Sequence, residues 1–272
     1  MTKNILFNNS KISIFLGISI ILCIIIIIIY QTNNNDGFTL NENTKDIDVY
    51  VINLDKDKDR LQKLEKYIKL NNNNINVIRY PGILGKDINK DHELFKKYLS
   101  PDFKADFNYN STIGCALSHI TLYNMLYQKF KNDISQEYFI ITEDDAIFVK
   151  DFGNKLNVVL NELPSDWDFV YLGSSKPVGK KYSTHLIKPE FQEGGNWGFF
   201  GYMLSKKGLR KIVKYSRLVD KPIDNFLKNT DLNYFIANPT IIKHDFDNVS
   251  NLTGINRKND SNSYNFIKII NN

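Results

Sequence analysis

YFIITEDDAIFV, residues Tyr138 to Val149, is the stretch that says most about this chain. It begins as a run of apolar and β-branched residues, which is typical of a buried strand. Three consecutive acids, Glu143, Asp144 and Asp145, follow at the carboxyl end of that run. Adjacent carboxylates repel one another and are costly near a core unless a cation or hydrogen-bond donors compensate them. The pattern favours a site for Mg²⁺ or Mn²⁺, and an exposed acidic turn is the alternative.

Apolar runs and helical repeats alternate on both sides of this stretch. We expect strands at 48–54, 75–80, 167–173 and 199–205, and helices at 57–70, 113–130, 152–163 and 206–215. Ser111 or Thr112 is expected to cap the long helix. The alternation predicts an α/β fold with a mostly parallel sheet and helices on both faces. In such sheets ligands bind at the carboxyl ends of the strands, where the three acids are expected.

The segment Ile12 to Tyr30, ISIFLGISIILCIIIIIIY, contains no charged residue. At about 1.5 Å per residue its length nearly spans a hydrocarbon core of about 30 Å, so we expect one transmembrane helix. A cleaved signal peptide is the alternative, and the polar Asn-rich segment that follows favours an uncleaved signal-anchor. Lys3 and Lys11 precede the span, which predicts a cytoplasmic N-terminus and a lumenal or extracellular domain. The expected division is a cytoplasmic tail (1–11), a membrane anchor (12–30), a stalk (31–46), a catalytic domain (47–255) and a polar C-terminal tail (256–272).

Composition excludes several classes of protein. Of the 272 residues, 42% are hydrophobic and 24% are charged, which is typical of a globular domain and not of a disordered chain. The net charge of +5 is spread along the chain, which argues against nucleic-acid binding. The two cysteines, Cys23 and Cys115, form no CxxC pair, which argues against a disulfide framework and a cysteine-based zinc site. No Walker lysine loop, GxGxxG or GxSxG occurs, so P-loop NTPases, simple dinucleotide enzymes and α/β-hydrolases are not indicated.

Five segments together resemble glycosyltransferase family 25, which includes lipooligosaccharide and procollagen galactosyltransferases. In chain order they are VYVINLDKDKDR, STIGCALSH, IITEDDAIF, GYMLSKKG and KPIDNF, and the resemblance extends from Asp48 to Asp245. The resemblance implies a GT-A-like nucleotide-sugar-binding fold and inverting transfer, usually from UDP-galactose and usually with a divalent metal. Two departures are Lys56, where the family often has Arg, and Ser111–Thr112, which replace Gly-Glu.

By position in the family's motifs, the resemblance implies which residues contact the nucleotide. These candidates are Asn53, Arg60, Ser118, His119 and Asp144. Three of these candidates also have a purely structural interpretation. Asn53 could cap a turn, Arg60 could form an ion pair with Asp57 or Asp59, and His119 could be a core or helix-surface histidine.

Inverting transfer also needs a cation for the leaving nucleotide and a base for the acceptor hydroxyl. Glu143, Asp145 and His244 are the candidate metal ligands, with a surface histidine as the alternative for His244. Asp224, expected in the first turn of a helix opened by Pro222, is the candidate base, and Glu193 is the second choice.

The sequence thus predicts a membrane-anchored inverting glycosyltransferase. The donor is expected to be a UDP-sugar carrying galactose, or else glucose, and the acceptor is a hydroxyl of a glycan or glycoprotein. A non-catalytic nucleotide- or sugar-binding surface protein on the same scaffold is the alternative. A hydrolase with paired carboxylates is a third and weaker option.

Overall fold

A computed structural model describes residues 46–72, 74–105, 108–191, 196, 198–245 and 268–269. The chain divides into two units, 1–43 and 44–272, and all described residues belong to the second. The expected cytoplasmic tail and membrane span, nearly all of the stalk and most of the C-terminal tail therefore lie outside the described residues. Within the described ranges, no helix is both long and apolar enough to cross a membrane.

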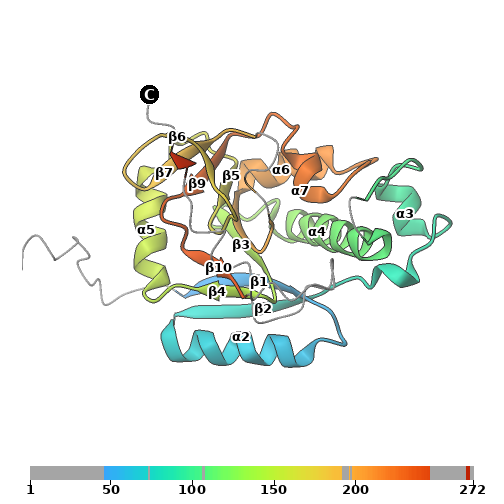
Figure 1. Ribbon diagram of the computed structural model, residues 1–272, viewed down its shortest axis with the longest axis horizontal. Helices are drawn as coiled ribbons and strands as arrows, with labels where there is room; N and C mark the ends of the chain where they lie inside the picture. Colours follow the sequence, from blue (N-terminus) through green and yellow to red (C-terminus); the bar gives the residue numbers. More distant parts are fainter. Residues whose placement is uncertain are drawn as a thin grey trace, which may run out of the picture. The chain divides into compact units, whose positions relative to one another are not determined.

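A sheet of nine strands forms the centre of the second unit (Figure 1). From edge to edge its strands are β11 (Lys268–Ile269), β6 (Val178–Lys181), β7 (Leu186–Pro189), β9 (Tyr234–Ala237), β5 (Phe169–Tyr171), β8 (Gly201–Ser205), β3 (Tyr138–Glu143), β1 (Ile47–Asn53) and β2 (Ile75–Pro81). Two short strands, β4 (Ala146–Phe148) and β10 (Ile242–His244), form a separate antiparallel pair.

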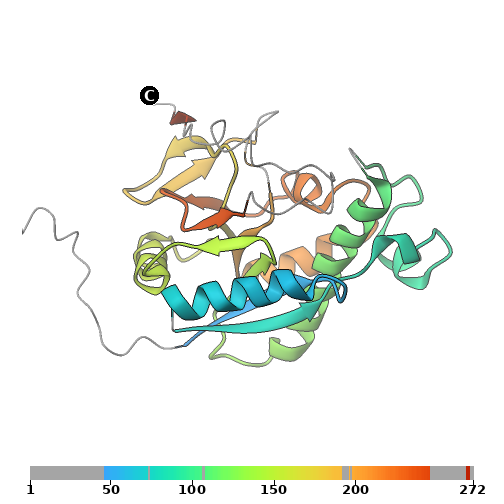
Figure 2. The same ribbon diagram turned by 60° about the horizontal axis from the view of Figure 1, so that its bottom comes forward.

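Helices cover both faces of this sheet, as Figures 1 and 2 show. The helices are α2 (Lys58–Asn71), the short 3₁₀ helix η1 (Gly85–Asp87), α3 (Glu93–Tyr98), α4 (Tyr109–Phe130), α5 (Phe152–Glu162), α6 (Lys206–Tyr215) and α7 (Ile223–Leu227). Apolar residues of α3, α4, α6 and α7 form one buried cluster with the sheet, and those of α2 and α5 form another.

Strand β1 shows why the apolar runs in the sequence are continuous. Tyr50 and Ile52 belong to the cluster on the α4 side, whereas Val49 and Val51 belong to the cluster on the α2 side. A strand alternates its side chains between two faces, so a strand covered on both faces needs apolar residues at every position.

The expectation of a mostly parallel sheet is wrong. Of the eight neighbouring strand pairs in the described sheet, four are parallel and four antiparallel. Only β2, β1 and β3 form a continuous parallel block, because α2 and α4 provide the crossover connections that parallel strands require. β6 and β7 follow each other without a helix between them and pair antiparallel, and β8 runs antiparallel to both β3 and β5.

Helix α4 begins earlier than its sequence indicates. Its N-cap is Asn108, whose side chain accepts a hydrogen bond of 3.0 Å from the backbone N–H of Ser111. Ser111 and Thr112, the expected caps, lie inside the first turn. An Asn cap satisfies one of the free N–H groups at a helix start as well as Ser or Thr does.

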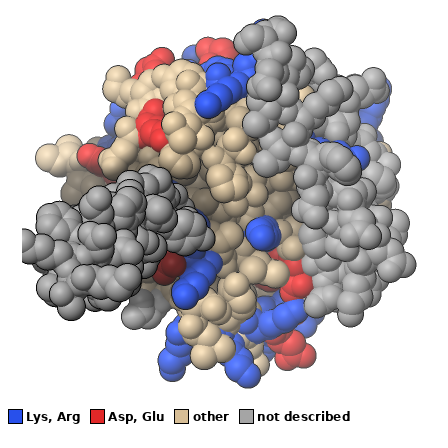
Figure 3. Space-filling view, turned by 60° about the vertical axis from the view of Figure 1, so that its left-hand side comes forward, with Lys and Arg blue, Asp and Glu red and all other residues tan. Residues whose placement is uncertain are grey.

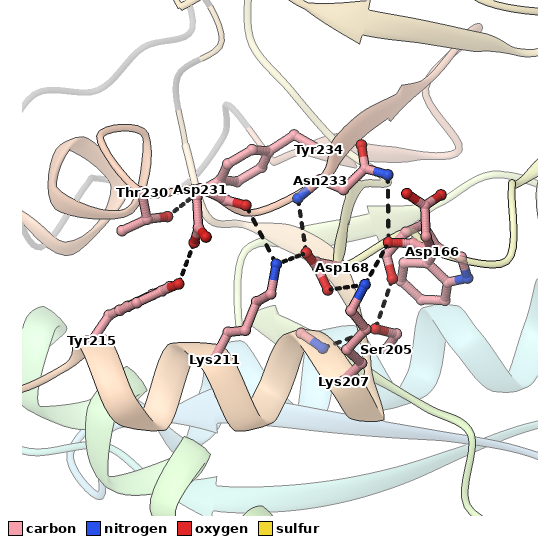
Figure 4. A network of polar contacts seen from close by, with 12 residues as sticks. Asp166, Asp168, Ser205, Lys207, Lys211, Tyr215, Thr230, Asp231, Asn233 and Tyr234 are labelled. Atoms are coloured by element: carbon pink, nitrogen blue, oxygen red, sulfur yellow. Dashed lines mark hydrogen bonds and ion pairs between the residues drawn. The ribbon is translucent and has the colours of Figure 1, made fainter.

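A buried carboxylate joins α6 to the ends of β5 and β9 (Figure 4). Asp168 has no exposed surface, and Lys211 Nζ lies 2.7 Å from its Oδ2. The same oxygen accepts a hydrogen bond of 2.9 Å from the backbone N–H of Asn233, and Lys207 Nζ lies 3.7 Å from Oδ1. These contacts compensate the burial of one charge and hold three elements together.

Among the described residues visible in Figure 3, basic and acidic side chains are mixed over a largely uncharged surface. This distribution agrees with the spread of charge along the sequence.

Replacing the buried carboxylate should destabilise the domain. We expect Asp168→Asn to lower the free energy of unfolding by about 3 kcal/mol, because Lys211 loses the charge that compensates it. Urea unfolding followed by near-ultraviolet circular dichroism measures this change. The matched control is Asp166→Asn at an exposed neighbouring position, which should stay within about 0.5 kcal/mol of the parent. Equal stability of the two variants would contradict the role given to Asp168.

Candidate active site

A cavity of about 320 Å³ lies at the carboxyl ends of the parallel strands β2, β1 and β3. Four segments line it: the turn after β1 with the start of α2, the loop after β2, the first half of α4, and the three acids after β3. This is the edge of the sheet where the sequence predicts the ligand.

Two glycines allow the loop after β2 to lie directly against α4. A Cβ atom at Gly85 would lie 1.7 Å from the carbonyl oxygen of Asn110, and one at Gly114 would lie 2.5 Å from that of Ile83. Ser118 fastens the contact, since its Oγ accepts a hydrogen bond of 2.8 Å from the N–H of Ile83 and donates one of 2.6 Å to the carbonyl of Gly114. Ser118 therefore lines the cavity and also holds its wall together.

Asp144 is buried and is held by two of the residues expected to bind nucleotide. Asn53 Nδ2 donates a hydrogen bond of 2.7 Å to its Oδ2, and Arg60 Nη2 lies 2.5 Å from its Oδ1. Asn53 does not line the cavity; its Oδ1 accepts a hydrogen bond of 3.0 Å from Arg79 Nε, so it connects two charged groups. Arg60 does line the cavity, and its observed partners are Asp144 and Asp145, in place of the Asp57 or Asp59 considered from the sequence.

Asp145 is buried next to a cation and a histidine. Arg60 Nη2 lies 3.2 Å and His244 Nε2 lies 3.1 Å from its Oδ2. The pairing of β10 with β4 brings His244 here, because it places His244 opposite Ala146. Next to this pair, the N–H of Asp245 donates a hydrogen bond of 2.7 Å to the carbonyl oxygen of Asp145. The other carboxylate oxygen, Oδ1, is buried and has no hydrogen-bond partner among the described residues.

This orphaned oxygen is the structural feature that fits a metal ion. A buried carboxylate oxygen without a donor costs free energy unless a cation or water binds it. Carboxylate oxygen and imidazole nitrogen are both ligands of divalent ions. Asp145 and His244, two of the three expected metal ligands, are thus placed together.

Glu143, the third expected metal ligand, points toward α4. Its Oε1 lies 3.3 Å from His119 Nε2 and accepts a hydrogen bond of 3.8 Å from the thiol of Cys115. His119 is buried, and its Nδ1 lies 2.7 Å from the hydroxyl of Tyr202. Burial raises the pKa of the Cys115 thiol well above its ordinary value, and the nearby charges of Glu143 and Asp224 raise it further.

The pKa values of the two buried aspartates shift in opposite directions. Burial raises the pKa of Asp144 to about 7, and the charges of Asp145 and Glu143 contribute, although Arg60 and Asn53 oppose the shift. Burial also acts to raise the pKa of Asp145. There, however, the hydrogen bond and charge of His244 together with Arg60 outweigh it, so the pKa of Asp145 is lowered.

Of the two candidate bases, only Asp224 lies among the described residues. Asp224 lies in the first turn of α7, as expected, and its Oδ1 accepts a hydrogen bond of 2.9 Å from the N–H of Asn225. It is absent from the described cavity lining, but it is near enough to raise the pKa of Cys115 and Tyr171 through its charge. Glu193, the second choice, lies outside the described residues.

Sequence reasoning missed two features of the cavity. Lys86, in the 3₁₀ helix after β2, lines it together with Lys56 and Arg60, so three cationic side chains face one space. The sequence signal was weak, since one lysine in a polar loop resembles any surface lysine. The second is the meeting of Glu143 with Cys115 and His119; the i, i+4 spacing places the last two on one helix face, but no sequence signal placed Glu143 opposite that face.

Comparison with known proteins identifies the family of this chain. A model of glycosyltransferase family 25, described as an LPS biosynthesis protein, matches residues 46–227. The chain therefore belongs to glycosyltransferase family 25, a class of transferases, and the matched range contains the acid cluster, α4 and Asp224.

Individual relatives are more distant. A procollagen lysyl hydroxylase and glycosyltransferase of Acanthamoeba polyphaga mimivirus is 29% identical over 86 residues, which cover 29% of this chain and 10% of that protein. A glycosyltransferase involved in the glycosylation of the major capsid of PBCV-1 has a TM-score of 0.40 at 11% identity, over 73% of this chain and 91% of that one. The glycosyltransferase GlyE of Streptococcus pneumoniae TIGR4 has a TM-score of 0.37 at 9% identity, over 74% and 54%.

The raised pKa of Asp144 predicts a pH-dependent effect of its replacement. Between its ordinary pKa of 3.8 and about 7, the folded protein keeps a proton that the unfolded chain has lost. This group therefore lowers the stability as the pH rises through that window. We expect Asp144→Asn, which cannot ionise, to gain stability relative to the parent between pH 5 and pH 8. Urea unfolding of both proteins across this range measures the difference, and a constant difference would contradict the assignment.

Proposed function

We propose that this domain transfers a hexose from a UDP-sugar to a hydroxyl group of a glycan or glycoprotein, with inversion at the sugar. Galactose is the proposed sugar, and glucose is the alternative. The observation that carries the proposal is the buried Oδ1 of Asp145, which has no hydrogen-bond partner in the described part of the chain and lies beside His244, in a cavity at the carboxyl ends of three parallel strands.

The charges around the cavity suit a nucleoside diphosphate. Lys56, Arg60 and Lys86 line it, and their positive charges attract phosphate oxygens. Asp145 and His244 are the proposed ligands of a divalent ion, Mn²⁺ or Mg²⁺. Such an ion, when bound, would neutralise charge that develops on the phosphate of the leaving nucleotide.

Transfer to a hydroxyl also needs a group that accepts its proton. Asp224 is the proposed base, because it lies at the start of α7 and close to Cys115 on the cavity wall. In this proposal its carboxylate takes the proton of the acceptor hydroxyl, the hydroxyl oxygen bonds to the sugar carbon, and the bond from that carbon to the phosphate oxygen of UDP breaks.

One observation favours the alternative, a nucleotide-binding protein without turnover. Arg60 pairs with both Asp144 and Asp145, so the acid cluster already has a cation that a metal must displace or accompany. In that alternative Arg60 compensates the carboxylates permanently, and the cavity binds a nucleotide without cleaving it.

The first experiment measures UDP release from a panel of UDP-sugars by the full chain in detergent, with Mn²⁺ and with EDTA. We expect Mn²⁺-dependent release from one sugar donor and a loss on the order of 100-fold in Asp145→Asn. Asp91→Asn, at a side chain that is 93% exposed, is the matched control and should retain activity. Metal-dependent UDP binding without release from any donor would support the binding-protein alternative, and full activity of Asp145→Asn would exclude Asp145 as a metal ligand.

The proposed base is tested separately. We expect Asp224→Asn to keep UDP affinity while transfer to an acceptor falls by about 10²- to 10⁴-fold, because only proton transfer is lost. Isothermal titration with UDP and an acceptor assay measure the two quantities. Asp220→Asn, at a half-exposed position four residues earlier, is the control. Unchanged transfer in Asp224→Asn would end this assignment.

We also propose that residues 12–30 anchor the domain on the lumenal or extracellular side of a membrane. The support is the uncharged segment and the preceding Lys3 and Lys11. The chain should remain with membranes after alkaline carbonate extraction, whereas a chain lacking residues 1–30 should be released. Release of both would contradict the anchor.

A further inference from the structure

We propose that Cys115, His119 and Glu143 form a second metal site in the cavity wall, one that binds zinc or another thiophilic divalent ion. This site is separate from Asp145 and His244, the pair proposed to hold Mn²⁺ or Mg²⁺. It does not depend on the proposed function, because zinc binding can be measured without donor or acceptor.

The three ligand atoms come from two elements that the fold brings together. Cys115 and His119 stand four residues apart on α4 and so share a helix face, and Glu143 ends β3 opposite that face. The thiol sulfur, a ring nitrogen and a carboxylate oxygen all lie within 4.8 Å of one another. All three residues line the cavity, so an ion can reach them from solvent.

Their spacing fits tetrahedral coordination. Zinc bonds of about 2.3 Å to sulfur and about 2.0–2.2 Å to nitrogen and oxygen place neighbouring tetrahedral ligands about 3.3–3.6 Å apart. His119 Nε2 and Glu143 Oε1 are 3.3 Å apart, and Cys115 Sγ and Glu143 Oε1 are 3.8 Å apart. The third pair, Cys115 Sγ and the ring nitrogen of His119, lies within 4.8 Å, so the side chains must move closer around an ion that replaces the present hydrogen bonds.

The surroundings of His119 keep the imidazole available as a ligand. Its Nδ1 lies 2.7 Å from the Tyr202 hydroxyl, which in turn lies 2.7 Å from the Tyr123 hydroxyl. Each hydroxyl can donate or accept, so Tyr202 can accept a hydrogen bond from Nδ1–H when Nε2 binds the ion. A fixed partner on the second ring nitrogen is the usual support of a metal-bound histidine.

The ligand atoms of the two sites favour different metal ions. A thiolate is a soft ligand that selects zinc over magnesium or manganese, whereas Asp145 and His244 offer only oxygen and nitrogen. The cysteine count argued against a zinc site built on cysteines. In this site a single thiolate, its proton released to solvent, shares the ion with an imidazole and a carboxylate.

Three protein ligands leave the fourth tetrahedral position open. Since the site is in the cavity wall, that position is available to water or to an oxygen of a molecule in the cavity. Zinc bound here would share the cavity with the side chains of Lys56, Arg60 and Lys86.

Cobalt titration of the metal-free full chain tests the site, because Co²⁺ replaces zinc in such sites and a cobalt–thiolate bond gives a charge-transfer absorption band. We expect this band to saturate at one equivalent and to disappear when Zn²⁺ is added. Cys115→Ser should abolish the band. Cys23→Ser, which removes the only other cysteine, is the matched control and should retain it.

Two further variants separate this site from the neighbouring acids. Glu143→Gln should weaken zinc binding, measured by chelator competition, by about tenfold or more. Asp145→Asn should keep the band and lose Mn²⁺ binding. No band in the full chain, a band that survives in Cys115→Ser, or a band lost in Asp145→Asn would each overturn the proposal. Failure of UDP-sugar turnover alone would leave it standing.

Discussion

The candidate site depends on the burial of carboxylates at the end of one strand. Asp144 and Asp145 follow β3 and are less than one-tenth exposed, so their carboxyl groups need hydrogen-bond donors or cations beside them. The compensating groups come from distant segments: Asn53 from β1, Arg60 from α2 and His244 from β10. The requirement to give two buried carboxyl groups polar partners therefore joins three parts of the chain at one edge of the sheet.

The partners of the three acids also determine which carboxylate oxygens in the cavity can bind a metal ion. Arg60 contacts both aspartates, yet Asp145 still has a buried oxygen without a hydrogen-bond partner among the described residues. Glu143 points away from this pair and toward Cys115 and His119, so three consecutive acids serve two clusters. Glu143 is the last residue of β3, whereas Asp144 and Asp145 lie in the turn that follows, and this change of backbone direction accounts for the division.

Much of the fold could be predicted where local pattern and tertiary environment agree. Strand β1 and helix α6 lie within a residue of their expected bounds, because β1 is buried on both faces and α6 has one apolar stripe. The orientation of β6, β7 and β8 could not be predicted, since an apolar run specifies a strand and not its direction. The cap of α4 was misplaced because Asn108, Ser111 and Thr112 are all acceptable caps.

For the site, the sequence by itself determined the acid cluster, its position at a strand end and the family to which the chain belongs. Tertiary structure alone decided the partners of those acids. Arg60 has Asp57 and Asp59 near it in sequence, but pairs with carboxylates more than 80 residues away because α2 packs beside the end of β3. His244 reaches Asp145 only through the pairing of β10 with β4. Contacts between distant segments depend on packing geometry, which local sequence patterns do not encode.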